Sequence, residues 1–262
     1  MPTTSNATAL GFSGTASSAP GDSDLPEVLL SEGSKGPEVQ RLQSVLVWLE
    51  YLSGKADGDF GPKTMQALTR FQRDWRLTPD GTYGPATRAA LLKALVPVKK
   101  PSVVSKPSRN HESRNGVAID AIILHHTATN SARVDLATLR WVQGNSRVSA
   151  HYLVGPDGTI YQLVPDKMAA WHAGRSSLHG ETEPTVNARS IGIEITNDGT
   201  GLTPFTEEQY RALEQLVPYL ARRYGVPKEN ILGHRDVAPG RKTDPADNFD
   251  WARIRRAVDA VV

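Results

Sequence analysis

Apolar residues recur every three or four positions in three stretches of the first hundred residues. The three series are Val39, Leu42, Leu46 and Leu49; Met65, Leu68, Phe71 and Trp75; and Leu91, Leu92 and Leu95. This spacing is typical of amphipathic helices that bury one face. The pattern therefore predicts a small all-α unit of three helices around a shared core.

An eight-residue motif repeats inside this unit. Residues 57–64 read DGDFGPKT, and residues 80–87 read DGTYGPAT, 23 positions further along the chain. In each copy the Asp-Gly pair favours a turn, and the proline suits the first turn of a helix, where its missing N–H costs nothing. Each copy therefore predicts a turn followed by the start of a helix.

The rest of the chain alternates between strand and helix patterns. Strands are expected at the apolar runs 121–124, 151–154, 159–164 and 191–195, and a Gly-Pro-Asp-Gly turn joins the second and third as in a hairpin. Thr206 and Gln209 match a capping box that opens a helix ending near Tyr224. A last helix is expected over residues 251–260. Together they predict an α/β domain whose central mixed sheet is flanked by helices.

Two stretches of different composition border these parts. Residues 1–27 are rich in Ser, Thr, Ala, Gly and Pro, have little to bury, and are expected to form a flexible tail. Residues 97–116 contain three prolines among small and basic residues and are expected to form a linker. The predicted domains are therefore 28–96 and 117–262.

Composition narrows the possible functions. The 262-residue chain has no cysteine, so any metal site must use His, Asp or Glu. The net charge of +2 gives no reason to expect a nucleic-acid partner. No apolar stretch approaches the roughly 18 residues of a membrane span, so no membrane insertion is expected. The N-terminus lacks the basic and apolar regions of a secretory signal, and we expect synthesis in the cytoplasm.

Two histidines and an aspartate stand out by their position. His125 ends the apolar run 121–124, His234 follows the apolar pair 231–232, and Asp244 lies ten residues after His234. Two imidazoles and a carboxylate make an open zinc site that leaves a fourth position for water. The spacing alone leaves open that these are two strand-end histidines and a turn aspartate before a proline.

The first domain resembles a known family. Residues 30–95 are similar to the peptidoglycan-binding domain found on many cell-wall hydrolases. The similarity rests on both copies of the repeat and on Gly33-Ser34-Lys35-Gly36, Val39, Leu42-Gln43 and Phe71-Gln72. The resemblance implies that bacterial peptidoglycan is the partner of this domain.

Five ordered blocks give the second domain a resemblance of its own. The blocks are residues 122–128, 148–152, 170–174, 187–194 and 233–245. They resemble the zinc-dependent N-acetylmuramoyl-L-alanine amidases of type 2, which include phage amidases, wall-recycling amidases and animal peptidoglycan-recognition proteins. The resemblance implies that His125, His234 and Asp244 bind Zn²⁺ and that Glu194 and Lys242 are catalytic.

Four further residues are candidates for substrate binding. Trp171 and His172 are expected to form a wall of the substrate groove, because an aromatic face suits sugar or peptide packing. The alternative is that Trp171 is an ordinary core residue. His151 either lines the site, orients a ligand or is structural. Asn187 either contacts substrate or caps a turn.

One departure from the wider family is informative. Some branches have a tyrosine just before the histidine of the second block and a cysteine as the third metal ligand. Here Ala150 and Asp244 take those places. The chain is therefore closer to the recycling-amidase branch, in which a glutamate and a lysine carry the proton transfer and the charge stabilisation.

These resemblances predict a monomeric peptidoglycan hydrolase similar to phage endolysins. Its expected reaction is hydrolysis of the amide between N-acetylmuramic acid and the L-alanine of the stem peptide, while the first domain anchors the enzyme to the wall. Without an export signal, it would reach the wall or periplasm after the membrane is breached. A bacterial autolysin, a recycling amidase and a non-catalytic peptidoglycan-recognition protein are the alternatives.

Overall fold

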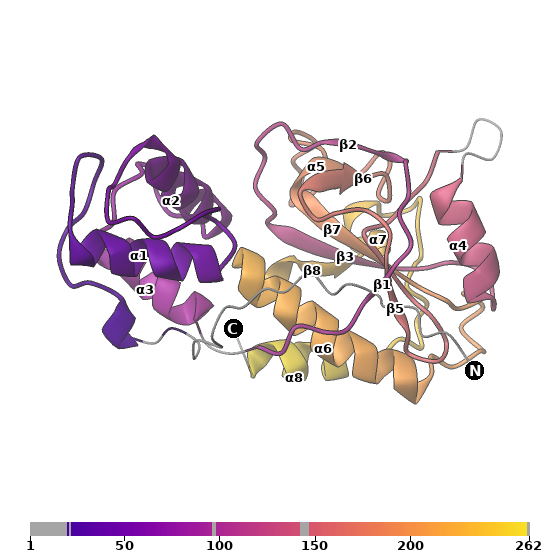
Figure 1. Cartoon of the computed structure of the whole chain (residues 1–262). Helices are drawn as coiled ribbons and strands as arrows, with labels where there is room; N and C mark the ends of the chain where they lie inside the picture. The colour runs from indigo at the N-terminus through magenta and orange to yellow at the C-terminus, as the bar shows by residue number, and fades with distance from the viewer. Residues whose placement is uncertain (1–19, 21, 96–97, 142–146, 261–262) are drawn as a thin grey trace, which may run out of the picture.

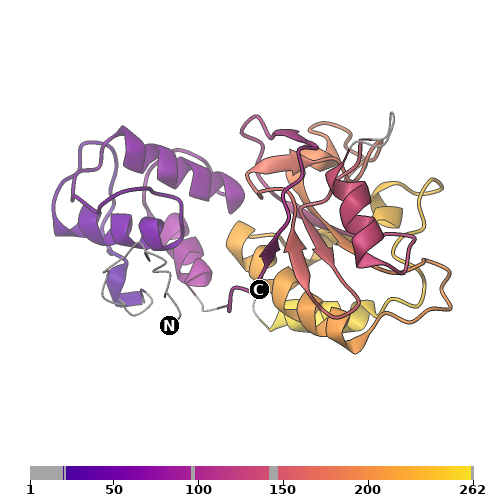
Figure 2. The same ribbon diagram turned by 45° about the vertical axis from the view of Figure 1, so that its right-hand side comes forward.

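A computed structural model describes residues 20, 22–95, 98–141 and 147–260. A helical domain and a domain built around a sheet lie side by side (Figure 1), and they stay separate in the turned view of Figure 2. The predicted fold class, a small all-α domain followed by an α/β domain with a mixed sheet, is confirmed. Most of the predicted tail, residues 1–19 and 21, lies outside the described residues.

Three helices make up the first domain. They are α1 (Pro37–Trp48), α2 (Pro62–Asp74) and α3 (Pro85–Ala94), and each has its proline in the first turn. Their apolar faces pack together in one core, as the periodicity predicts. The short helix η1 (Asp22–Asp24) precedes this core, Leu25 is buried in it, and Tyr83 Oη donates to Pro26 O (2.6 Å). The last residues of the predicted tail therefore pack against the domain.

A buried glutamine organises each copy of the repeat. In the first copy, Gln43 donates to Asp57 Oδ1 (2.8 Å) and Thr64 Oγ1 (3.0 Å) and accepts from Gly58 N (2.8 Å). In the second copy the same three bonds join Gln72 to Asp80 (2.9 Å), Thr87 (3.1 Å) and Gly81 (2.8 Å). A buried amide must be hydrogen-bonded, which explains why Asp, Gly and Thr recur at matching positions.

The second domain is built on a six-stranded mixed sheet in the order β1-β5-β4-β7-β3-β8. The strands are β1 (Val104–Ser105), β3 (Ala121–His126), β4 (Tyr152–Val154), β5 (Ile160–Gln162), β7 (Ser190–Ile195) and β8 (Ile231–Gly233). β4 and β5 pair antiparallel in the predicted hairpin, whereas β4, β7, β3 and β8 run parallel. The carboxyl ends of these four parallel strands therefore lie at one edge.

Helices cover both faces of this sheet (Figure 1). On one face lie α6 (Glu207–Tyr224), which opens with the predicted capping box, and α8 (Trp251–Asp259). On the other face lie α4 (Ala132–Arg140), α5 (Val186–Arg189) and α7 (His234–Val237). A second 3-10 helix, η2 (Lys228–Asn230), precedes β8. None of the helices in the described parts of the chain is both long and apolar enough to cross a membrane.

The stretch predicted as a linker contains two short strands. β1 pairs with β5, and β2 (His111–Ser113) pairs with β6 (Met168–Ala170) in a separate two-stranded sheet. Both residues of β1 are exposed. Its pairing therefore rests on backbone hydrogen bonds and leaves no alternation of apolar and polar residues for the sequence to reveal.

The two domains touch near the carboxyl ends of α2 and α6. Gly225 ends α6 with a left-handed φ of 59°, and a Cβ at this position would lie 3.1 Å from Trp75 Cδ2. Arg76 donates to the carbonyl oxygen of Gly225, and Arg223 forms an ion pair with Glu50 (2.7 Å). Gly225 thus serves both the helix cap and the close approach of the first domain.

Candidate functional site

Side-chain alternation along β3 and β7 sets the position of the candidate site. Ile122 and Leu124 pack in the core with α6 and α8, so His125 points to the opposite face of the sheet. Ile193 packs in the same core, which directs Glu194 to the same face as His125. The parallel register pairs His125 with Glu194. These two side chains therefore stand side by side on strands about 4.8 Å apart.

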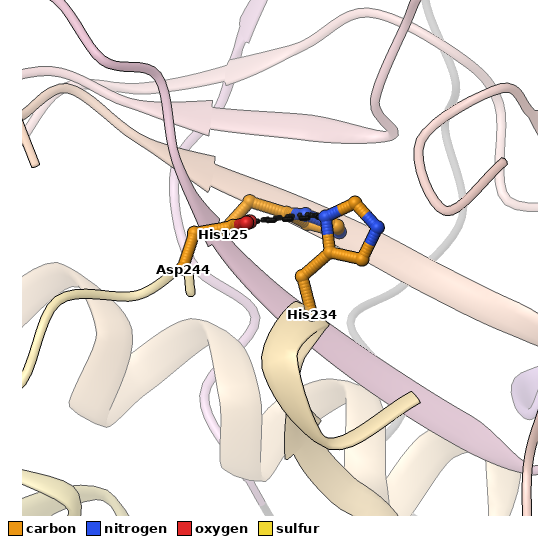
Figure 3. A group of neighbouring side chains, drawn as sticks. All are labelled: His125, His234 and Asp244. Atoms are coloured by element: carbon orange, nitrogen blue, oxygen red, sulfur yellow. Dashed lines mark hydrogen bonds and ion pairs between the residues drawn. The ribbon is translucent and has the colours of Figure 1, made fainter. Parts of the chain in front are cut away.

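Two further side chains converge on His125. His234 begins α7 directly after β8, and Asp244 lies on the loop that follows this helix. Figure 3 shows the three side chains pointing at one another from a strand, a helix and a loop. Nδ1 of His125 lies 2.9 Å from Nδ1 of His234 and 3.0 Å from Oδ2 of Asp244, and Nδ1 of His234 lies 3.1 Å from that oxygen. All three residues are buried.

The cluster has the character of a metal site. Burial lowers the pKa of His125 to about 4, so its ring is neutral at pH 7. Nε2 of His234 lies 3.0 Å from Ala173 O, an oxygen that can only accept. A neutral His234 therefore has its proton on Nε2 and turns the lone pair of Nδ1 toward the cluster. A lone pair and a carboxylate oxygen this close repel each other unless a proton or cation lies between them.

Glu194 adjoins the cluster and has an unusual carboxyl group. Its Oε2 is buried and has no hydrogen-bond partner among the described residues. Burial, together with the charges of Asp244 and Asp135, raises the pKa of Glu194 to about 8, while the charge of Lys242 acts in the opposite direction. Lys242 itself is exposed on the loop that carries Asp244. A carboxyl group poised near neutral pH suits a proton carrier.

The sequence of this domain matches the model of a known protein family. The model described as N-acetylmuramoyl-L-alanine amidase matches residues 115–247, which is 133 of the 262 residues. The chain belongs to this family. A second model, for a peptidoglycan-binding domain, matches residues 35–91.

Two curated relatives of this chain are named as amidases. Over 112 residues the chain is 46% identical to the 1,6-anhydro-N-acetylmuramyl-L-alanine amidase AmpD of Citrobacter freundii, covering 43% of this chain and 58% of that protein. Over 150 residues it is 37% identical to the N-acetylmuramoyl-L-alanine amidase AmiD of Escherichia coli K12, covering 52% of each. The chain thus spans little more than half the length of the curated relatives it matches.

Solved structures show the same fold. A crystal structure of a selenomethionine AmpD derivative matches with a TM-score of 0.55 and 32% identity, covering 61% of this chain and 96% of that one. The endolysin LysCS from Clostridium intestinale URNW matches with a TM-score of 0.50 and 24% identity, covering 62% of this chain and 99% of that one. The second likeness concerns the fold alone.

Two of the residues expected to bind substrate in this amidase-family domain are buried. His172 is only 8% exposed and packs on the backbone of Gly192, where a Cβ would lie 2.3 Å from its ring. The ring of His172 fills the space that the missing side chain of Gly192 leaves, and its expected place in a wall of the substrate groove stays a prediction. His151 is fully buried, with Nδ1 accepting from Gly192 N (2.9 Å) and Nε2 2.9 Å from Met168 O. These contacts favour a structural role for His151 over the other roles considered for it.

The other two candidates lie nearer the surface. Trp171 is partly exposed, and its backbone N donates to Ser149 Oγ (2.9 Å). Asn187 Oδ1 accepts from the backbone N of His172 (3.2 Å) and of Ala173 (2.8 Å). Asn187 therefore holds the segment that carries Trp171, and substrate contact by Trp171 stays a prediction.

Arg114 is an organising residue that the sequence pattern does not reveal. It comes from the predicted linker, is buried, and donates to the carbonyl oxygens of Asp166 (2.7 Å), Ala188 (2.6 Å) and Ser190 (2.8 Å). It thereby joins α5 and the start of β7 to the β5–β6 connection. One arginine in a basic, proline-rich stretch carries no sequence signal of burial.

A cavity of about 520 Å³ lies between the two domains. Its lining includes Tyr51 and Asp74 from the first domain and Arg114, Tyr152 and Asp166 from the second. Neither the three clustered side chains nor Glu194 and Lys242 line this cavity. The convergence of reactive groups therefore identifies the candidate active site, and cavity volume does not.

Replacing Glu194 with glutamine should remove a pH dependence from the stability of the metal-free protein. The pKa of about 8 in the folded state lies above the ordinary value of 4.5. The contribution of Glu194 to stability is therefore complete below about pH 4.5 and is lost as the pH rises through 8. Over this range the unfolding free energy of the wild type should fall relative to the variant by up to about 1.4 kcal/mol per pH unit.

Urea unfolding between pH 5 and pH 8, in the presence of a chelator, measures this difference. Glu208→Gln removes an exposed acid on α6 and serves as the matched control, which should follow the wild type. Stability curves that run parallel for the wild type and Glu194→Gln would contradict the raised pKa.

Proposed function

We propose that the protein is a zinc-dependent N-acetylmuramoyl-L-alanine amidase. Its reaction is hydrolysis of the amide between N-acetylmuramic acid and the L-alanine of the peptidoglycan stem peptide. The observation that carries the proposal is the convergence of His125, His234 and Asp244 next to Glu194. Family membership and the similarity to the amidases AmpD and AmiD support this amide as the target.

The three clustered side chains fit Zn²⁺. Catalytic zinc sites use three protein ligands, imidazole nitrogens and carboxylate oxygens among them, and leave a fourth position open. Ligand atoms about 2.0–2.1 Å from one tetrahedral zinc ion lie about 3.3 Å apart. The observed separations of 2.9–3.1 Å are close to this value. When bound, zinc would lower the pKa of a water molecule to about 7 and polarise the amide carbonyl.

Glu194 and Lys242 supply the protein's own part of the reaction. Hydrolysis forms a C–O bond to the water oxygen and breaks the C–N bond, and one proton must pass from the water to the leaving nitrogen. Glu194 takes this proton on a carboxylate oxygen and delivers it to the nitrogen of L-alanine. The ammonium of Lys242 stabilises the negative charge that develops on the carbonyl oxygen.

We further propose that the first domain holds the enzyme on intact cell walls, as in an endolysin. The match of residues 35–91 to a peptidoglycan-binding model supports this role. Tethering raises the effective concentration of the catalytic domain at an insoluble substrate. A recycling amidase that acts on soluble fragments gains nothing from such a tether.

A defined muropeptide tests the reaction directly. The enzyme should release one new amino group, on L-alanine, and no new reducing sugar end, as measured by mass spectrometry. Glu194→Ala should lower the rate by about 10²–10⁴ while zinc content stays at the wild-type level. Glu208→Ala, on α6, should keep full activity.

Two outcomes would contradict the proposed reaction. New reducing ends would mark the protein as a glycosidase. Bound zinc without any turnover of muropeptides or purified walls would mark it as a recognition protein.

Removing residues 1–96 tests the anchoring role. The shortened protein should keep its zinc and its turnover of soluble muropeptides, but its binding to purified walls should fall by about 10²-fold or more. Circular dichroism and zinc content verify that it is folded. Undiminished wall binding, or faster turnover of soluble anhydro-muropeptides than of walls by the full chain, would contradict an endolysin-like role.

A further inference from the structure

A chain of hydrogen bonds runs from the backbone of α5 to the ring of His125. The hydroxyl of Ser190 contacts Val186 O, and Nε2 of His172 lies 3.1 Å from Ser190 Oγ. Nδ1 of His172 in turn lies 3.0 Å from Nε2 of His125. All four residues are buried. Each polar hydrogen of this chain must therefore be placed among these groups.

The carbonyl at one end of this series of hydrogen bonds determines where each proton lies. A carbonyl has no proton, so the hydroxyl of Ser190 donates to Val186 O, which leaves Oγ to accept from Nε2 of His172. A neutral His172 with its proton on Nε2 can only accept at Nδ1. The N–H of a neutral His125 therefore lies on Nε2, and its lone pair lies on Nδ1, which faces His234 and Asp244.

We propose that Ser190 and His172 are positioning residues that set the tautomer and the ring orientation of His125. They keep the proton on Nε2, so that Nδ1 is free for a cation before one arrives. The reverse order would put a proton on Nδ1 of His125, in the middle of the cluster, and this proton would have to leave before a metal could bind. The proposal rests on the metal site of the proposed function.

Packing around His172 supports this role. Ser190, Gly192 and Glu194 are alternate residues of β7 and share the face that carries the site. Ser190 holds one end of the series of hydrogen bonds, Gly192 leaves room for the His172 ring, and Glu194 stands beside His125. Asn187 fixes the backbone of His172 through its amide oxygen. His234 reaches the same tautomer by a shorter route, since its Nε2 meets Ala173 O directly.

Substitutions of Ser190 and His172 in the full-length protein test the proposal, and zinc affinity is the quantity measured. His172→Asn puts an amide oxygen near the place of Nδ1 and can still accept from His125, whereas His172→Ala cannot. Competition with a chromogenic chelator should show zinc affinity falling by about 10–100-fold in His172→Ala and in Ser190→Ala. In His172→Asn, zinc affinity should return most of the way to the wild-type value. Thermal melts followed by circular dichroism identify any variant that fails to fold.

Nitrogen-15 NMR of the histidine rings in the metal-free wild type reads the tautomer directly and needs no variant. His125 should carry its proton on Nε2, and Ser190→Ala should populate the Nδ1–H form. A wild-type His125 protonated on Nδ1 would overturn the proposed role of Ser190 and His172. Unchanged zinc affinity in folded His172→Ala would overturn it as well. A wild type that binds no zinc and cuts no muropeptide would instead overturn the proposed function.

Discussion

The in-register parallel pairing of β3 with β7 is the constraint on which the candidate site depends. It sends alternate apolar residues of both strands, among them Ile122, Leu124 and Ile193, into the core beneath α6 and α8. It sends His125, Ser190, Gly192 and Glu194 to the other face. A slip of one residue in either strand would exchange the two sets. The same alternation that makes the core apolar therefore specifies which side chains meet at the site.

Burial then gives the two neighbours on these strands opposite properties. Removing His125 from water favours its neutral form, which is the form that binds a metal, and the same effect favours the protonated form of Glu194. A cation held by His125, His234 and Asp244 would favour the ionised carboxylate of Glu194. Metal binding would thus turn a protonated acid into a base that is ready to accept a proton.

Much of the fold could be predicted because its main elements bury long apolar patterns. The helices of the first domain, the strands β3 and β7 and the helix α6 all show clear periods. Short elements such as β1 and β2 bury almost nothing and depend on backbone pairing with distant segments, so no apolar pattern marks them in the sequence. The reactive residues carry motif signals, but the burial of His172 depends on a side chain that Gly192 lacks. No pattern in the sequence shows that space.

The position of a bound zinc ion tests the metal centre most directly. Anomalous X-ray scattering from a crystal of the zinc-loaded full chain would locate the ion without reference to activity. We expect one peak within about 2.2 Å of Nδ1 of His125, Nδ1 of His234 and a carboxylate oxygen of Asp244. A peak elsewhere in the molecule, or coordination through Nε2 of either histidine, would contradict the arrangement described here.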